Sequence, residues 1–485
     1  MHHASLSRFD GVRRSARTLL LAGLGLSACL AASSRASAQV SCPAEDAPGQ
    51  TSIYGGSWGR DTSAAPGSVL ACRSIAATKL WANSAKSPSS YVSRVARAIS
   101  VRFVTTDASE RKVPATALVL VPNAVPTENA QGTKAPLIAL ATGTAGVSDA
   151  CAPSKTVRSG TSLVANNVDY YLSKGLTVVV VDFLGLGVDL GAVDGDDHPY
   201  LEGPSAAHVM LDALRAARKV PGALFNNPTG LIPAAWPVAV EGYSQGGGAA
   251  IWAAAHAASY APELPLKAAV VGAAPVDLKA AVTQIDNSIF RSLFGYALHG
   301  IENATDPSTR LLNLQDYLTT VGKELVNRTR TTCAVENGTQ TAVDVLFGAY
   351  HLNELITDVP TFMDLAPVRE FFRKNSLIID GVAQAAKPKS NVFSYHGMID
   401  GVVPYGPHYD LVVKRWSAAI GGAILTGEAA LPRAAYAFQP SIAGAHATTS
   451  GLERNDSRSD QRYAPYEWVY DGLFNAVRTW PDLTP

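Results

Sequence analysis

Residues Gly242–Gly246 read Gly-Tyr-Ser-Gln-Gly, a pattern that can present a reactive serine. It fits G-x-S-x-G, in which a sharp turn between a strand and a helix raises a serine hydroxyl above a parallel sheet. The apolar run PVAVEG leads into the motif, and the alanine-rich run GGAAIWAAAHAASYA follows it. A glycine-rich structural turn is the alternative, but the flanking strand and helix favour a nucleophile. We therefore expect Ser244 to attack a carbonyl carbon.

A serine hydroxyl needs a histidine to take its proton and a carboxylate to orient that histidine. For a serine on such a turn, the acid and then the histidine follow later in the chain. Asp400 ends the segment NVFSYHGMID and opens the next loop, where the acid is expected. Asp277, at the end of KAAVVGAAPVD, is the alternative, because a loop after the preceding strand can also reach the site.

The base is found by elimination, since His408 and His446 are the histidines that follow Asp400. His408 opens a helical run and is too near Asp400 in sequence to occupy the next loop. His446 lies in GAHATT, a loop of small residues after the last candidate strand. We therefore expect His446 to be the base. Packing or surface roles are expected for His198, His351, His396 and His408.

An attacked carbonyl becomes an oxyanion, which two backbone N–H groups can stabilise. The residue after the nucleophile, Gln245, is expected to supply one donor. The other should come from residues 141–146, ATGTAG, which follow an early strand. Thr144 is our first choice in this loop and Gly143 the second, while an ordinary glycine turn is the alternative.

The elements that must position these residues follow an alternating pattern. From about residue 99, β-branched apolar runs alternate with segments of helical period, as in helices packed on a parallel sheet. Runs such as TVVVVDF are apolar on both faces, as central strands are. We therefore predict an α/β fold with a mostly parallel central sheet flanked by helices. The expected strands are SVRFVTT, TALVLVP, PLIALAT, TVVVVDF, WPVAVEG, KAAVVGA, NVFSYHG and AAYAFQP, and the expected flanking helices are SAAHVMLDALRAARK, GGAAIWAAAHAASYA, PHYDLVVKRWSAAIG and PYEWVYDGLFNAVRTW.

The alternation stops between about Leu278 and Lys389, where helical segments follow one another. Because the strand NVFSYHG comes afterwards, we interpret this stretch as a helical cap inserted into the sheet, with a separate helical domain as the alternative. Its run FRSLFGYALHG could line an acyl tunnel or simply form core. The predicted organisation is a signal peptide at 1–38, a core of 39–277 and 390–485, and a cap at 278–389.

The first residues indicate export. Arginines precede the apolar run TLLLAGLGL, and small residues stand before Gln39, as at a signal-peptide cleavage site. The run is about half the roughly 20 residues that span a bilayer, which argues against a membrane anchor. The tetrapeptide ending at Cys29 resembles a lipobox, so a lipoprotein anchored through Cys29 is the alternative to a secreted protein.

Four cysteines follow the predicted cleavage site, an even number in an oxidising compartment, which favours two disulfides. They lack the paired C-x-x-C spacing of zinc sites. Four cysteines allow three pairings, of which we favour Cys42 with Cys72 and Cys151 with Cys333.

The composition excludes several classes of protein. The chain is 47% hydrophobic and 16% charged, so it can bury a large core and is not disordered. Lysine plus arginine and aspartate plus glutamate both number 40, so no net field favours nucleic acid or an anionic membrane. We expect no nucleic-acid partner.

Several of these segments together resemble the secretory lipase family of α/β-hydrolases. They are the run from EGYSQGGG to VVGAAPVDL, CAPS at Cys151, HPYLEGPSAAHVMLDALRAA, and GMIDGVVP followed by GAHATT. The resemblance implies an α/β-hydrolase fold with a helical cap over an acyl pocket and no cofactor. It maps the catalytic residues onto Ser244, Asp400 and His446. One departure is the oxyanion turn, where such enzymes often carry His-Gly or an acidic residue and this chain has ATGT.

The predicted activity is hydrolysis of carboxylic esters, in particular acylglycerols, through an acyl-enzyme. Such a lipase or carboxylesterase needs no cofactor or metal and would contact lipid aggregates at their interface. One alternative is a peptidase or amidase on the same fold, and another is a non-catalytic surface-binding protein.

Overall fold

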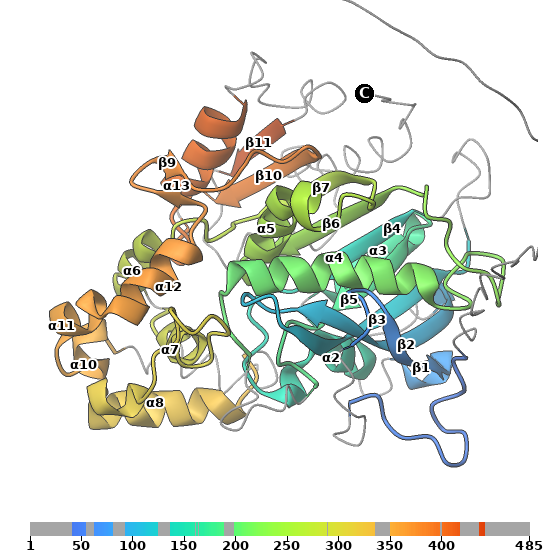
Figure 1. The fold of residues 1–485 in the computed structure, drawn as a ribbon, viewed down its shortest axis with the longest axis horizontal. Coiled ribbons are helices and arrows are strands. Elements are labelled where there is room, and N and C mark those ends of the chain that lie inside the picture. The colour runs from blue at the N-terminus through green and yellow to red at the C-terminus, as the bar shows by residue number, and fades with distance from the viewer. Residues whose placement is uncertain are drawn as a thin grey trace, which may run out of the picture. The chain divides into compact units, whose positions relative to one another are not determined.

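A mostly parallel sheet runs through the part of the chain that the computed structural model describes (Figure 1). The described residues are 41–54, 63–80, 93–124, 136–160, 162, 164–188, 198–288, 290–334, 350–397, 400–417 and 436–441. The strands of the sheet are β1 (Val69–Ile75), β2 (Val95–Thr106), β3 (Lys112–Pro122), β4 (Leu137–Ala141), β5 (Thr177–Val181), β6 (Val238–Tyr243), β7 (Leu266–Gly272), β10 (Asn391–Gly397) and β11 (Tyr436–Ser441).

The strand order is β1-β2-β3-β5-β4-β6-β7-β10-β11, nine strands in all. The neighbours from β5 to β11 pair in parallel, whereas β1, β2 and β3 form an antiparallel edge that joins β5. All eight predicted strands are confirmed. The edge strand β1 was not predicted, because it precedes the alternating region and pairs antiparallel with β2 without a crossover helix.

The two faces of the sheet bury different sets of side chains. In β5, Val179 and Val181 join the core on one face, while Val178 and Val180 join the core on the other. This alternation is the reason that a central strand is apolar throughout. The first core is covered by α4 (Gly203–Lys219) and α5 (Gln245–Tyr260), and the second by α2 (Pro153–Ser159) and α3 (Ala165–Ser173). Figure 1 shows α4 crossing in front of the strands.

A run of helices lies between β7 and β10, beside the sheet in Figure 1. Among its described residues, no strand joins the nine-stranded sheet. The helices bury their own apolar cluster, which includes Phe294, Leu298 and Phe371. They are α6 (Leu278–Asp286), α7 (Leu293–Glu302), α8 (Thr320–Thr331), α10 (Leu352–Leu355), α11 (Val359–Asp364) and α12 (Ala366–Lys374), with a 3-10 turn η3 (Leu314–Tyr317) and, before β10, a hairpin of β8 (Ile378–Ile379) and β9 (Val382–Ala383).

Shorter elements complete the described chain. The predicted helix after β10 is present as α13 (Tyr405–Tyr409) followed by a π-helical stretch, η4 (Asp410–Ser417). Two 3-10 turns, η1 (Ala77–Lys79) and η2 (Asp149–Cys151), lie earlier. The predicted signal peptide, Cys29 and the predicted last helix at 465–480 lie outside the described residues.

Both favoured disulfides are confirmed. Cys42 pairs with Cys72 and Cys151 pairs with Cys333, with Cα–Cα distances of 4.8 and 5.2 Å. The first bridge fastens the segment before β1 to that edge strand. The second joins η2, just beyond β4, to the residues that follow α8.

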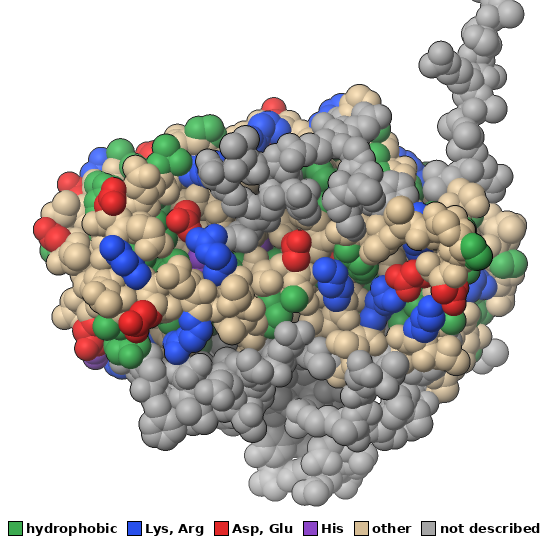
Figure 2. Space-filling model, turned by 90° about the horizontal axis from the view of Figure 1, so that it is seen from below, with side chains coloured by type: hydrophobic (Ala, Val, Ile, Leu, Met, Phe, Trp, Pro, Cys, Tyr) green, Lys and Arg blue, Asp and Glu red, His purple; other side chains and the backbone are tan. Residues whose placement is uncertain are grey.

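The described surface carries both charge signs. Figure 2 shows acidic and basic side chains interspersed on one face, in keeping with the equal totals in the sequence. Within the described ranges, no helix is long and apolar enough to cross a membrane.

Candidate active site

Ser244 lies at the turn between β6 and α5. Its backbone has φ 56° and ψ −118°, a region that L-residues rarely adopt and that costs about 1–3 kcal/mol. Hydrogen bonds hold this conformation: the Ser244 N–H donates to Gly272 O at 2.9 Å, and Gly248 N–H donates to Ser244 O at 2.9 Å. The serine therefore stands at the carboxyl edge of the parallel strands, half-buried, at the start of a 16-residue helix.

The two glycines of the motif are required by backbone contacts. A Cβ added to Gly242 would lie 2.1 Å from Gly246 O, and one added to Gly246 would lie 2.1 Å from Ala141 O. Neither contact can open without separating α5 from the strand ends. The G-x-S-x-G spacing thus follows from close packing around the turn.

The predicted oxyanion loop borders the serine. β4 pairs with β6 so that Ala141 lies opposite Gly242, and the loop continues from there. A Cβ on Gly143 would lie 3.8 Å from Ser244 Cβ. Gln245 is the first residue of α5 and is 5% exposed. Both predicted donor segments therefore lie beside Ser244, one of them at the positive end of a helix dipole.

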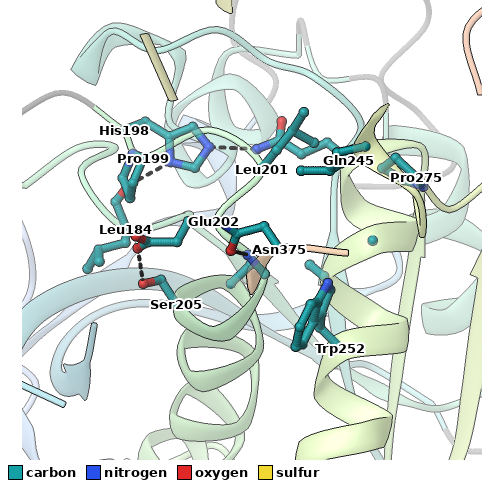
Figure 3. A pocket seen from close by; sticks show the side chains of 15 residues that line it. Leu184, His198, Pro199, Leu201, Glu202, Ser205, Gln245, Trp252, Pro275 and Asn375 are labelled. Atoms are coloured by element: carbon teal, nitrogen blue, oxygen red, sulfur yellow. Dashed lines mark hydrogen bonds between the residues drawn. The ribbon is translucent and has the colours of Figure 1, made fainter. Parts of the chain in front are cut away.

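The side chains of Thr144 and Gln245 both form hydrogen bonds to the turn formed by residues 198–200. Thr144 Oγ1 and Tyr200 Oη are hydrogen-bonded at 2.6 Å. Gln245 Nε2 lies 2.6 Å from His198 Nε2, and His198 Nδ1 donates to Leu184 O at 2.8 Å (Figure 3). Burial lowers the pKa of His198 to about 4, so the ring is neutral and Nε2 accepts from the amide. From the sequence we expected a packing or surface role for His198, and this contact with Gln245 was not predicted.

Asp400 follows β10 and is 2% exposed. Its Oδ1 accepts the N–H groups of Val402 and Val403, each at 2.8 Å. Its backbone carbonyl accepts from Gln284 Nε2 of α6 at 2.6 Å. The carboxylate is therefore held by its own loop, and α6 in turn holds the backbone of that loop.

Two buried histidines stand behind this carboxylate. His396 Nε2 lies 3.4 Å from Asp400 Oδ2 and donates to Val403 O at 3.0 Å. With that tautomer, His396 Nδ1 accepts from His408 Nδ1 at 2.9 Å. Burial, followed by the neighbouring His396, holds the pKa of His408 well below its usual range. Both histidines pack, as expected, but His396 lies against the candidate acid and His408 against His396, contacts that were not predicted.

The alternative acid, Asp277, has a different partner. Its Oδ1 accepts the N–H of Ala280 at 3.0 Å, so it is the N-cap of α6. The predicted base, His446, lies outside the described residues. The structure thus describes Ser244, Gln245, Gly143, Thr144, Asp400 and Asp277 of the predicted residues.

A small pocket lies next to Gln245, between α5, the start of α4 and the first residue of α6 (Figure 3). Ser244 is not among its lining residues. Its buried Glu202 accepts from the backbone N–H and hydroxyl of Thr305 at 2.7 and 2.6 Å and from Ser205. The pocket therefore lies where the helical segment contacts the start of α4. Its side chains include Leu184, His198, Leu201, Trp252, Pro275, Leu278 and Asn375.

Among the described residues, no group of three or more His, Cys, Asp or Glu side chains could hold a metal ion. The described residues thus supply a strained serine with two donor segments beside it and, in the loop after β10, a buried carboxylate. Residues 152–449 of this chain match the family described as secretory lipase, and the match covers more than half of the 485 residues.

The chain belongs to the secretory lipase family.

Secreted lipases of Malassezia are similar to this chain at low sequence identity. The chain is 27% identical to the secreted triacylglycerol lipase LIP7 of Malassezia globosa, over 53% of this chain and 51% of the relative. It is 24% identical to the secreted triacylglycerol lipase LIP5 of Malassezia furfur, over 53% of this chain and 62% of the relative. The matched part thus spans about half to three fifths of these relatives.

Solved structures share the α/β-hydrolase fold. Candida antarctica lipase A in its closed state superposes with a TM-score of 0.58 at 21% identity, over 79% of this chain and 78% of that one. A mutant of the rice cell wall degrading esterase LipA from Xanthomonas oryzae gives 0.58 at 18% identity, over 81% and 96% of the two chains. The predicted α/β-hydrolase fold and the predicted family are both confirmed.

Proposed function

We propose that this secretory lipase family member hydrolyses carboxylic esters, in particular acylglycerols, through an acyl-enzyme on Ser244. The observation that carries the proposal is the strained serine at the β6–α5 turn, with the loop 141–146 and Gln245 beside it. The relatives named above are called triacylglycerol lipases, which favours a lipid ester as the substrate.

In the proposed reaction, His446 takes the Ser244 proton as the hydroxyl oxygen attacks the ester carbonyl. The developing oxyanion accepts from the N–H groups of Gln245 and of Thr144 or Gly143. His446 then protonates the departing alcohol, and it later activates water to release the acid from Ser244. Every step uses protein groups and water, so the route needs no cofactor and no metal.

We assign the acid to Asp400. Its loop follows β10, its carboxylate is buried, and two backbone N–H groups hold one of its oxygens at 2.8 Å. Asp277 already caps α6 through its carboxylate. A carboxylate that orients the base must be held in a fixed position. Asp400 is held in this way, and unlike Asp277 it does not also serve as the N-cap of a helix.

We propose that residues 278–389 are a cap on a core formed by 39–277 and 390–485. In support, the helices of this segment bury their own apolar cluster, while β7 and β10, which flank it in sequence, pair directly. Phe294 and Leu298 of FRSLFGYALHG belong to that cluster, so they act as core rather than as a tunnel wall. Phe290 is half-buried and is the side chain of this run nearest the Asp400 loop.

We propose that the chain is exported after removal of residues 1–38. The named relatives are secreted lipases, and the two disulfides suit an oxidising compartment. A lipoprotein anchored through Cys29 is the alternative, and mass spectrometry of the exported protein separates the two. The substrate would then be met at the surface of lipid aggregates, with no role for nucleic acid.

The test is turnover of p-nitrophenyl butyrate and of an emulsified triacylglycerol by wild-type protein and by Ser244→Ala. We expect the variant to remain folded and to lose several orders of magnitude in kcat, since the acyl-enzyme needs that oxygen. Ser259→Ala, on an exposed turn of the same helix, is the matched control and should keep wild-type rates. Full activity of Ser244→Ala, or cleavage of peptides and amides in preference to esters, would exclude the proposal.

A further inference from the structure

The turn His198–Tyr200, just before α4, contacts both segments that frame Ser244. We infer that His198 and Tyr200 are positioning residues that hold the two oxyanion donors at a fixed separation, by tying the loop 141–146 to the start of α5. This inference rests on the proposed function and adds to it two residues that do not touch the substrate.

The first contact, between Tyr200 and Thr144, holds the loop 141–146, and we call it the loop tether. Beyond Ala141 the ladder between β4 and β6 ends, so the sheet no longer fixes residues 142–146. Tyr200 Oη lies 2.6 Å from Thr144 Oγ1. A backbone hydrogen bond also holds the next residue, since Ala334 N–H donates to Ala145 O at 2.8 Å. Tyr200 is therefore hydrogen-bonded to Thr144, the residue that we expect to supply the second oxyanion donor.

The second contact, between His198 and Gln245, holds the start of α5, and we call it the helix tether. Gln245 donates from Nε2 to His198 Nε2 at 2.6 Å, while its own backbone N–H is the other expected donor. His198 cannot rotate freely, because its Nδ1 donates to Leu184 O at 2.8 Å and its ring stacks on Phe183 with centroids 5.2 Å apart. Figure 3 shows His198 between Leu184 and Gln245, with a hydrogen bond to each.

The turn between the tethers is stiff. Tyr200 N–H donates to His198 O at 2.8 Å, and the two rings meet edge to face at 6.0 Å. Both side chains are buried, at 3% and 5% exposure. Tyr200 also packs against Tyr296 of α7, with centroids 6.1 Å apart. A displacement of the loop would therefore have to move a packed aromatic cluster.

The consequence for catalysis follows from how an oxyanion hole works. Its donors must lie about 2.7–3.1 Å from the oxyanion, and loss of one donor costs about a hundred- to a thousandfold in kcat. A tether that sets the donor position, without touching the substrate, should therefore affect kcat by less than a lost donor and leave KM nearly unchanged.

The loop tether is tested with Tyr200→Phe, Thr144→Val and their combination. Each single change removes the same hydrogen bond, so we expect each to lower kcat about tenfold with KM within about twofold, and the double variant to lose little more. Thr144→Ser keeps the hydroxyl and should restore most of the rate. Tyr296→Phe is the matched control, because it removes a hydroxyl of the same aromatic cluster whose partner is Thr332 O at 3.4 Å.

The helix tether is tested with a conservative pair at His198. The side-chain oxygen of His198→Gln can still accept from Gln245, whereas His198→Leu removes the acceptor. We expect His198→Gln to keep a larger part of kcat than His198→Leu at equal folded fraction.

A second measurement separates positioning from loss of structure. A p-nitrophenyl alkylphosphonate forms a tetrahedral adduct on a reactive serine, and its rate of reaction with Ser244 depends on the oxyanion donors. In Tyr200→Phe this rate should fall in step with kcat, while the midpoint of thermal unfolding matches that of Tyr296→Phe.

Two results would overturn the inference while leaving the proposed function in place. If wild-type protein is active and labelled at Ser244 while Tyr200→Phe and Thr144→Val keep wild-type kcat and labelling rates, the tethers have no part in positioning and the proposed function stands. If Tyr296→Phe lowers kcat as much as Tyr200→Phe does, the effect belongs to the aromatic cluster. An inactive, unlabelled wild type would instead exclude the proposed function together with the inference.

Discussion

At the scale of single residues, the structure distinguishes the two candidates for the catalytic acid, Asp277 and Asp400, which the sequence left as alternatives. Asp277 and Asp400 each follow a strand of the parallel sheet. The Asp277 carboxylate is the N-cap of α6, whereas that of Asp400 is buried against His396 and two backbone N–H groups. The two residues should therefore respond differently to the same substitution.

Asp400→Asn should lower kcat by several orders of magnitude, because an amide cannot stabilise the imidazolium of the base and favours the wrong tautomer. Asp277→Asn keeps an N-cap oxygen and should leave kcat within a few-fold of wild type. Steady-state kinetics at equal folded fraction, with circular dichroism to verify folding, checks both. Equal losses in the two variants would contradict the assignment of Asp400.

At the scale of elements, the contacts between the helical segment after β7 and the rest of the described chain include two beside the oxyanion loop and the start of α4. One is the bridge between Cys151 and Cys333, which brings the end of α8 to the residues after the oxyanion loop. The other is the buried carboxylate of Glu202, which accepts from Thr305. The segment is therefore anchored beside the site and not only through its own chain ends.

The two disulfides should differ in their contribution to stability. The bridge Cys151–Cys333 spans 182 residues of sequence and Cys42–Cys72 spans 30. Chain-entropy arguments then give up to about 5 and about 4 kcal/mol of unfolding free energy, respectively. We expect Cys151→Ser/Cys333→Ser to lower the urea midpoint more than Cys42→Ser/Cys72→Ser. The reverse order would show that native-state contacts outweigh loop closure.

The same segment bears on acyl-chain length. Each buried methylene contributes about 0.8 kcal/mol of transfer free energy, so kcat/KM should rise from acetyl to octanoyl esters if the segment walls an acyl site. Phe290→Trp, close to the Asp400 loop, should shift the optimum towards shorter chains. Leu312→Trp, at a position 66% exposed, is the control. A rate maximum at acetyl in all three proteins would leave the segment without a role in acyl binding.

At the scale of the whole molecule, buried titratable groups make stability depend on pH. Burial lowers the pKa of His198 to about 4, and burial together with the nearby His256 and Arg215 lowers that of His208 to about 4. Between about pH 4 and 6.5 the unfolded chain binds protons that the folded chain does not, so the free energy of unfolding falls as pH falls. Asp182 acts in the opposite direction, because burial raises its pKa to about 6.

We expect acidification from pH 7 to pH 5 to cost about 2 kcal/mol of unfolding free energy for each of the two histidines, offset by about 1 kcal/mol from Asp182. His208→Gln, on α4, should therefore reduce this dependence by about two thirds, from about 3 to about 1 kcal/mol. Urea midpoints at the two pH values measure it, with His351→Gln as the comparison for loss of a surface histidine. An unchanged dependence in His208→Gln would show that this ring is protonated in the folded protein.

Local patterns in the sequence determined most of the architecture. Eight strands, the helices α4 and α5, and the strand-turn-helix around Ser244 follow from the spacing of apolar residues and glycines, because such signals act between residues a few positions apart. The cysteine pairing was chosen from three possibilities and confirmed. The assignments of Asp400 and His446 stay predictions that rest on chain order.

Only the tertiary structure decided which side chains meet. Tyr200 and Thr144 are 56 positions apart, and His198 and Gln245 are 47 positions apart, yet each pair is in hydrogen-bond contact because α4 begins beside the ends of β4 and β6. Likewise, β1 joins the sheet by pairing with β2, and the Asp277 carboxylate serves as the N-cap of α6. No periodicity encodes such contacts, since they arise when the sheet and its helices pack and bring distant loops to one edge.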